Sequence, residues 1–248
     1  MKFLCLPGGY SNSKALQTQL GPFCDALRSS NQDVNFLFTQ GTSPVNPPPE
    51  FQGFFGPPPN YTFTVVDFPE LVKFNMRDFP RCDTPEETIK YAVKKAGNPT
   101  FSAVRAAMSR LIDMLDDNPD IEGVIGYSEG AEVAATLILE EERQRKEFGR
   151  ISRIKCAIFI CGWPAKDPVT GRPVLSDDFD TEPITIPTCH VVGAADPFIH
   201  GSMALYNTCD PDTADLFDHG GGHVIPRNKQ TLRDLSEVVH DMIVSVAS

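Results

Sequence analysis

Short apolar runs alternate with longer segments of helical periodicity along most of the chain, and this alternation constrains the fold more than any other feature. Apolar runs of this kind are typical of strands buried on both faces, which occur in parallel sheets covered by helices. The expected strands are 2–6, 34–38, 61–66, 123–127, 156–161, 189–192 and 214–217. The expected helices are 13–29, 99–116, 129–146, 199–206 and 228–247. We therefore predict an α/β fold with a mostly parallel sheet and helices on both faces.

One region, residues 41–98, interrupts the alternation. Seven prolines between Pro44 and Pro59 are interleaved with Phe51, Phe54 and Phe55, and proline at this density excludes a regular helix or a central strand. A chain of 248 residues can bury one full α/β core. We expect a single domain over 1–248 with an irregular 41–98 insertion, which is either a rigid surface connection or a lid or wall of an apolar substrate cleft.

The charge, the apolar segments and the cysteines restrict the binding partners and the cellular compartment that we expect for this chain. The formal net charge of −11 argues against a nucleic acid, which binds through clustered Lys and Arg. The apolar run at the N-terminus stops at Pro7, too early for a secretory signal, and no segment is apolar for long enough to cross a membrane. The seven cysteines are odd in number, scattered and free of any CxxC pair, which favours free thiols in a reducing cytoplasm.

A candidate nucleophile lies in the stretch Gly-Tyr-Ser-Glu-Gly, residues 126–130, which has the pattern G-x-S-x-G. An expected strand precedes it and an expected helix follows it. In a nucleophile elbow the serine occupies a strained strand-to-helix turn, and side chains in place of the glycines would collide with neighbouring backbone. The turn exposes the hydroxyl and aims the positive end of the helix dipole at it. The pattern predicts that Ser128 is a nucleophile, the alternative being a tight turn with an idle serine.

A serine hydroxyl becomes a good nucleophile only when a base removes its proton and an acid orients that base. In α/β-hydrolases the partners follow along the chain in the order serine, acid, histidine. Asp196 comes soon after the expected strand 189–192, which places it at the carboxyl edge of the sheet, where the acid belongs. We predict Asp196 as the acid, although an Asp-Pro pair is also common in turns and helix caps.

Two histidines, His219 and His223, flank three glycines in "DHGGGHVIP". A zinc pair at this spacing requires a helix, which consecutive glycines disfavour. The HGGG oxyanion loop of some esterases lies early in the chain, between a strand and the first helix, and so these residues are not that element. They form the loop after the last expected strand. We predict His223 as the base, because a position further along this loop reaches Ser128 more easily than His219 does.

The position of an oxyanion loop belongs instead to "LPGGYS", between the first expected strand and the first expected helix. Its glycines let the backbone approach a substrate carbonyl. A backbone N–H of Gly9 or of Tyr10 can then act together with that of Glu129, and the sequence does not choose between the first two.

Four ordered motifs, "LCLPGGYSNS", "GYSEGAEVAA", "GAADPF" and "HGGGHVIP", together resemble the fungal FSH1-type serine hydrolases. That family includes thioesterase-like hydrolases encoded beside polyketide synthases. The resemblance extends over essentially the whole chain and implies an α/β-hydrolase fold, Ser128, Asp196 and His223 as a catalytic triad, and no organic cofactor or metal. The chain departs from the family pattern at Pro7, where many relatives have histidine, and at Glu129, where glutamine is common.

The leading functional hypothesis is hydrolysis of an acyl ester or thioester, most specifically release of a polyketide-like acyl chain from a carrier protein. Carrier proteins are typically acidic, so docking would require a local basic patch, and residues 143–155 form the one strong basic cluster. A solvated helix end, whose dipole favours positive charge, also explains that cluster. The alternatives are a carboxylesterase acting on free small or lipid-like esters and a hydrolase-fold binding protein without activity.

Overall fold

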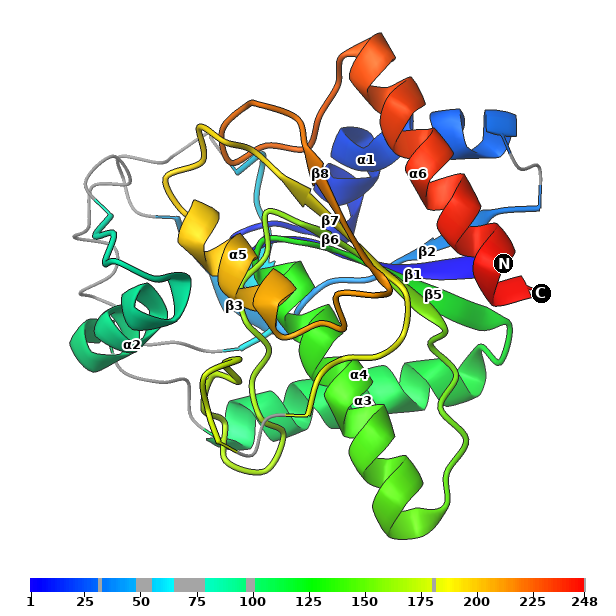
Figure 1. Ribbon diagram of the computed structural model, residues 1–248. Coiled ribbons are helices and arrows are strands. Elements are labelled where there is room, and N and C mark those ends of the chain that lie inside the picture. The colour runs from blue at the N-terminus through cyan, green and yellow to red at the C-terminus, as the bar shows by residue number, and fades with distance from the viewer. Residues whose placement is uncertain (31–32, 48–54, 65–78, 97–100, 180–181, 248) are drawn as a thin grey trace.

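One sheet of six strands runs through the molecule (Figure 1). The computed structural model describes residues 1–30, 33–47, 55–64, 79–96, 101–179 and 182–247. The strands lie in the order β2-β1-β5-β6-β7-β8, and every neighbouring pair is parallel. Their bounds are β1 Lys2–Leu6, β2 Asn35–Phe38, β5 Ile121–Tyr127, β6 Cys156–Ile160, β7 Thr188–Val192 and β8 Ala214–Asp218. The predicted parallel α/β architecture is confirmed.

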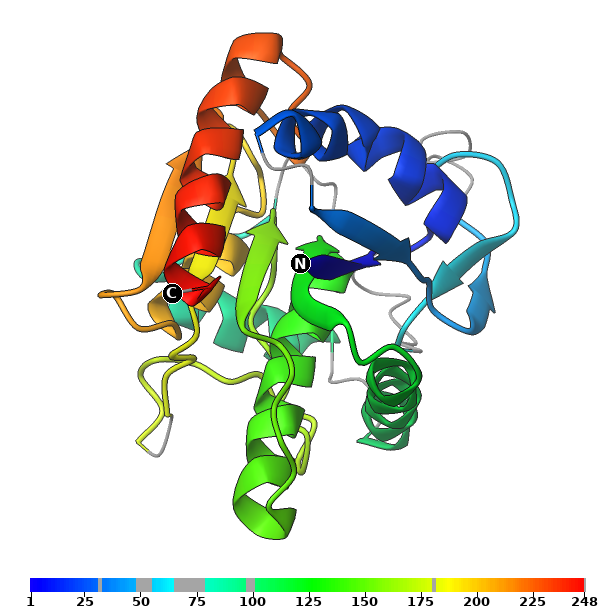
Figure 2. The same cartoon turned by 90° about the vertical axis from the view of Figure 1, so that its right-hand side faces the viewer.

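Helices cover both faces of this sheet (Figures 1 and 2). The helices are α1 Ser13–Ser30, α2 Pro85–Ala96, α3 Phe101–Asp117, α4 Glu129–Phe148, α5 Ile199–Asn207 and α6 Lys229–Ala247. Successive side chains of a strand point to opposite faces, so Leu4 and Leu6 of β1 join the core beneath α3 and α4, while Phe3 and Cys5 join the core beneath α1 and α6. Among the described residues, no helix is long and apolar enough to cross a membrane.

The strand order predicts a crevice at the carboxyl edge of the sheet. From β1 the chain passes to β2 on one side, whereas β5, the next strand to join, lies on the other side. Loops that leave neighbouring strands in opposite directions open a space at this switch point, where α/β proteins bind their ligands. The segment after β1 and the turn after β5 therefore lie next to each other at the centre of the sheet edge.

The segment 41–98 is less irregular than its prolines suggest. Strand β3 (Ser43–Val45) pairs antiparallel with β4 (Asn60–Thr62) in a separate two-stranded sheet. The prediction that 61–66 is a strand of the main sheet is therefore wrong. Helix α2 was not expected here, although acidic residues in its first turn and basic residues in its last turn complement the helix dipole.

Candidate active site

Ser128 occupies the turn between β5 and α4 in a left-handed backbone conformation, with φ 54° and ψ −119°. Few residues other than glycine adopt a positive φ, and such strain is common at functional turns. The two glycines of the motif are required by close packing. A Cβ on Gly126 would collide with backbone of α4, and one on Gly130 would collide with the carbonyl oxygen of Leu6. The predicted elbow geometry is therefore present.

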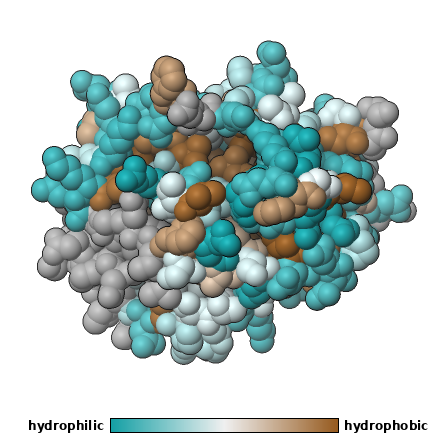
Figure 3. Space-filling model, turned by 90° about the horizontal axis from the view of Figure 1, so that it is seen from below, coloured by the Kyte–Doolittle hydropathy of each residue, from teal (hydrophilic) through white to brown (hydrophobic). Residues whose placement is uncertain are grey.

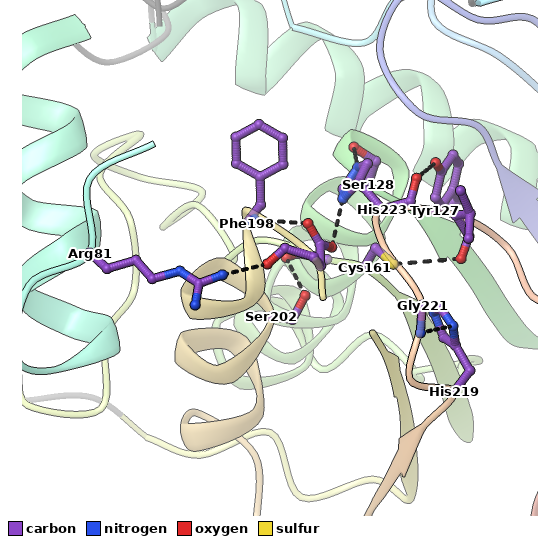
Figure 4. Close-up of polar contacts among 12 residues, drawn as sticks. Arg81, Tyr127, Ser128, Cys161, Phe198, Ser202, His219, Gly221 and His223 are labelled. Atoms are coloured by element: carbon purple, nitrogen blue, oxygen red, sulfur yellow. Dashed lines mark hydrogen bonds and ion pairs between the residues drawn. The ribbon is translucent and has the colours of Figure 1, made fainter. Parts of the chain in front are cut away.

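His223 lies between Ser128 and Asp196 (Figure 4). Its Nε2 is 3.0 Å from the Ser128 hydroxyl oxygen, and its Nδ1 is 2.8 Å from Oδ2 of Asp196. A carboxylate only accepts hydrogen bonds, so Nδ1 carries the proton and Nε2 keeps a free lone pair facing the hydroxyl. The structure thus brings together the three residues that the sequence selected, in the arrangement needed for a base to accept the serine proton.

Asp196 is held rigidly from several directions and is only 1% exposed. Its Oδ1 accepts the backbone N–H of Phe198 at 2.8 Å, and its backbone carbonyl accepts a hydrogen bond from Nη2 of Arg81, also at 2.8 Å. Arg81 comes from the segment just before α2. These contacts fix the orientation of the carboxylate toward His223.

The ring of His223 packs between two aromatic side chains. Its centroid lies 5.5 Å from that of Tyr127 and 5.3 Å from that of Phe198. The Tyr127 hydroxyl donates to the backbone carbonyl of His223 at 2.9 Å, and burial raises the pKa of Tyr127, which keeps the phenol protonated as a donor. The loop after β8 is thereby anchored to the strand that precedes Ser128.

His219 points away from this group (Figure 4). Its Nδ1 accepts the backbone N–H of Gly221 at 3.2 Å, while its buried Nε2 has no hydrogen-bond partner in the described part of the chain. His190 is buried in β7, where burial lowers its pKa to about 3. His200 pairs with the Thr88 hydroxyl of α2 at 2.8 Å. The structure therefore places His223, and not His219, against Ser128.

The loop after β1 lies beside the elbow. A Cβ on Gly8 would be 3.2 Å from Cβ of Ser128, and one on Gly9 would be 3.3 Å from Oε2 of Glu129. Tyr10 has a positive φ of 57°, and its ring centroid lies 5.2 Å from that of Phe55. The predicted cleft residue Phe55 thus lies next to this loop, whereas Phe51 and Phe54 fall outside the described residues.

Comparison with known proteins identifies the family. The profile of the family described as "Serine hydrolase (FSH1)" matches residues 1–235. The chain belongs to the FSH1 family of serine hydrolases. This membership confirms the resemblance that the four motifs carry, and Ser128, Asp196 and His223 all lie within the matched range.

Several fungal proteins are similar to this chain over nearly its whole length. "Esterase FPY3" of Fusarium mangiferae is 26% identical and covers 98% of this chain and 97% of its own length. "Esterase FUS5" of Gibberella moniliformis is 28% identical and covers 96% of this chain and 85% of its own length. "Hydrolase phiM" of Talaromyces stipitatus is 26% identical and covers 94% of this chain and 83% of its own length. The chain is therefore similar to fungal proteins that are called esterases and hydrolases.

Two solved structures, one of them an esterase, share the fold of this FSH1-family chain. Esterase PE8 superposes with a TM-score of 0.54 at 18% identity and covers 97% of this chain and 92% of its own. SOBER1 of Arabidopsis thaliana superposes with a TM-score of 0.53 at 17% identity, with 98% and 99% covered. At this identity the likeness shows an α/β-hydrolase fold.

Cys161, Asp196 and His223 form a group whose types could ligate a metal, since one ligand atom of each lies within 4.8 Å of the others. The geometry fits a metal poorly. Asp196 and His223 already direct their facing atoms at each other. Burial, and next the charge of Asp196, raises the pKa of the Cys161 thiol, and only the thiolate is a good ligand. These residues fit a hydrogen-bonded protonic site better than a metal site.

Four residues next to Ser128, Asp196 and His223 were not selected from the sequence: Arg81, Tyr127, Cys161 and Phe198. Two of them belong to the selected motifs, because Tyr127 is the residue before the serine and Phe198 ends "GAADPF". For Arg81 and Cys161 the sequence holds no comparable signal, since their approach to Asp196 depends on how distant segments pack.

Proposed function

We propose that this FSH1-family chain hydrolyses an acyl ester or thioester through Ser128, His223 and Asp196. The supporting observation is the continuous hydrogen-bonded series from the Ser128 hydroxyl through His223 to Asp196. The Ser128 oxygen forms a bond to the acyl carbon while His223 takes the hydroxyl proton. When the carbon–oxygen or carbon–sulfur bond breaks, that proton passes to the departing alcohol or thiol. Water then attacks the acyl-enzyme in the same way and releases the acid.

The negative oxygen of each tetrahedral intermediate requires donors. We propose two donors: the backbone N–H of Glu129 at the start of α4, and the N–H of Gly9 or Tyr10 in the loop after β1. Intrahelical hydrogen bonds do not use the first N–H groups of a helix, and these groups carry the positive end of its dipole. Donors already held in place cost no reorganisation during the reaction, which makes them effective.

An aromatic cluster offers apolar surface beside His223. Phe198 lies against His223, and its ring centroid is 5.0 Å from that of Phe79 and 6.1 Å from that of Trp163. Tyr10, on the loop after β1, makes a second aromatic contact with Phe55, which comes from the segment before β4. Ligand sites are typically apolar with a few placed polar groups. We infer that these aromatic groups contact an acyl chain of apolar character.

For the leaving group, the sequence-derived hypothesis is the phosphopantetheine thiol of an acyl carrier protein, with a polyketide-like acyl chain. This hypothesis rests on the family resemblance, together with the apolar surface beside His223. An acidic carrier would dock on a surface with unpaired positive charge.

A free acyl ester is the second candidate, and a specific observation favours it. Each of the basic side chains in residues 143–155 makes an ion pair with an acidic side chain of this same chain. Figure 3, which views the molecule from below, shows hydrophilic and hydrophobic residues intermixed on that face. This cluster therefore offers little net positive charge to an acidic carrier, and a free ester requires none.

Kinetics on matched substrates test the proposal. The same acyl group is offered as a carrier-bound thioester, as a short thioester of the free pantetheine thiol and as a simple oxygen ester. A kcat/KM at least about tenfold higher for the carrier-bound form supports the carrier hypothesis, and a preference for the free ester assigns a carboxylesterase.

Covalent labelling by a fluorophosphonate tests whether Ser128 is a nucleophile at all. If the probe labels wild type and Ser128→Ala equally, or labels neither of them, the proposed function is overturned and an inactive binding protein is favoured.

A further inference from the structure

Glu129, the residue after the nucleophile, directs one carboxyl oxygen into a dense set of donors. Its Oε1 accepts the backbone N–H groups of Phe63 and Thr64, each at 3.1 Å, and the hydroxyl of Thr64 at 3.2 Å. It also accepts a short hydrogen bond from the hydroxyl of Thr62. This oxygen therefore ties the segment after β4 to the first turn of α4.

The other carboxyl oxygen is left without a partner. Oε2 of Glu129 is sealed from solvent and makes no hydrogen bond to any residue that the structure describes, although the residue as a whole keeps some exposure. It faces Gly9, at whose position a Cβ would be 3.3 Å away. A buried oxygen without a donor is costly when it carries charge, and this one lies beside the loop that supplies a proposed oxyanion donor.

The charged groups around Glu129 do not offset a negative charge on it. Burial, and to a smaller extent the charge of Glu132 one turn further along α4, raises the Glu129 pKa. Lys166 forms an ion pair with Glu132 at 3.6 Å and so does not neutralise Glu129. On α3, Arg110 lies 5.8 Å from the ring centroid of Phe63 and donates to Thr39 and Gln40.

Tyr10, in the loop after β1, supplies no positive charge, because burial, and next the charge of Glu129, raises its pKa. Burial is the largest cause of a shift in the pKa of Glu129 from 4.5 to about 7, against the opposing hydrogen bonds of Thr62 and Thr64.

We propose that Glu129 is a positioning residue that must be a neutral acid, protonated on Oε2, for acyl transfer to occur. In the neutral form its Oε1 holds the segment after β4 against the elbow. In the ionised form it sets a negative charge beside Gly9 and its own backbone N–H, where the substrate oxygen becomes negative. This inference rests on the proposed function, since it concerns the oxyanion of that reaction.

The proposal fixes the direction in which activity changes with pH on the alkaline side. Glu129 must be protonated, so activity falls as pH passes the Glu129 pKa of about 7. The proposal predicts that the alkaline limb of the kcat/KM profile belongs to Glu129.

Glu129→Gln separates charge from shape, because the amide keeps an acceptor oxygen in place of Oε1 and is neutral at every pH. We expect the ratio of kcat/KM for E129Q to that of wild type to be lowest at pH 6. Above pH 7 this ratio should rise by up to about tenfold per pH unit, because wild type loses activity there and E129Q does not. A ratio that stays flat from pH 6 to 9 overturns the proposal. So does a folded E129Q that is more than about tenfold slower than wild type at pH 6.

Glu141→Gln is the matched control. Glu141 is buried on the same helix and accepts backbone N–H groups, those of Arg153 and Ile154 at 2.9 and 3.1 Å, far along α4 from Ser128. The ratio of kcat/KM for Glu141→Gln to that of wild type should not change with pH.

A second measurement needs no Glu129 variant, in case E129Q does not fold. The rate at which a fluorophosphonate labels wild type must fall above pH 7, and a rate that rises steadily to pH 9 overturns the proposal. If wild type hydrolyses the substrate and Ser128→Ala does not, the proposed function stands. If the E129Q ratio is nevertheless constant with pH, only the proposed role of Glu129 is overturned.

Discussion

Nδ1 of His223 lies 2.8 Å from Oδ2 of Asp196, a carboxyl group that is almost completely buried. The pairing determines which ring nitrogen carries the proton, and so it determines that Nε2 faces Ser128 as an acceptor. The packing of Tyr127 and Phe198 against the ring holds this orientation. The contact therefore controls both the tautomer and the orientation of the His223 ring.

Asp196→Asn tests this control. The amide can present its N–H₂ to Nδ1, which would then become the acceptor and place the proton on Nε2, facing the serine. We expect kcat to fall by about three to four orders of magnitude with the fold retained. Steady-state kinetics on a chromogenic ester and a circular dichroism spectrum check this. A fall of less than tenfold would show that Asp196 does not orient the base.

The two histidines of the glycine-rich loop provide an internal comparison. His223→Ala removes the group bonded to Ser128 and should lower kcat by at least about a thousandfold. His219→Ala should change kcat by no more than about threefold, because the one hydrogen bond of the His219 side chain among the described residues is with Gly221 of its own loop. The measurement is kcat/KM for both variants under one set of conditions, and the reverse ranking contradicts the assignment of the base.

The alternation of apolar runs predicted the main sheet well because its strands are buried on both faces. The six predicted strands that join it end within two residues of the observed ones. The run 61–66 failed for a physical reason: β-type residues alone do not say which strand they pair with, and β4 pairs locally with β3. Helix α2 was missed because the nearby prolines suggested irregular structure throughout, although its own sequence has helical charge placement.

For the site, chain order selected Ser128, Asp196 and His223, and the structure brings them together, while their catalytic role stays a prediction. Motifs succeed here because each of the three residues lies in the segment that follows a strand of one parallel sheet, so that all of them reach the same edge. Arg81 is different. Its contact with Asp196 joins residues that are 115 apart in sequence and come from a segment without a motif. Such a contact depends on packing that no local pattern encodes.

Two helical glycines make a matched test of the elbow. A Cβ on Gly130 of α4 would collide with the carbonyl of Leu6, whereas one on Gly21 of α1 would meet no atom within 4 Å. We expect Gly130→Ala to destabilise the fold by about 1–3 kcal/mol and to lower activity, because α4 must shift away from β1. Gly21→Ala should change the free energy of unfolding less and leave activity unaltered, because the helix preference of alanine is opposed by the neighbouring ring of Pro22, which crowds a Cβ on the residue before it. Chemical unfolding of both variants provides the measurement, and equal effects would argue against close packing at the elbow.

The buried carboxyl of Glu129 should make stability depend on pH in a defined direction. Its pKa is about 7 in the folded chain against an ordinary 4.5, so the folded chain keeps a proton that the unfolded chain loses over this range. Stability therefore falls as pH rises from about 4.5 to about 7, and above that range the folded state carries the full cost of the buried charge.

Glu129→Gln removes this dependence of stability on pH. Its free energy of unfolding relative to wild type should increase by an amount on the order of 2 kcal/mol between pH 4.5 and 7.5. Urea unfolding at several pH values measures the difference, with Ser128→Ala as a control that changes no titrating side chain. A difference between E129Q and wild type that is constant with pH would mean that Glu129 ionises as readily in the folded chain as in the unfolded one.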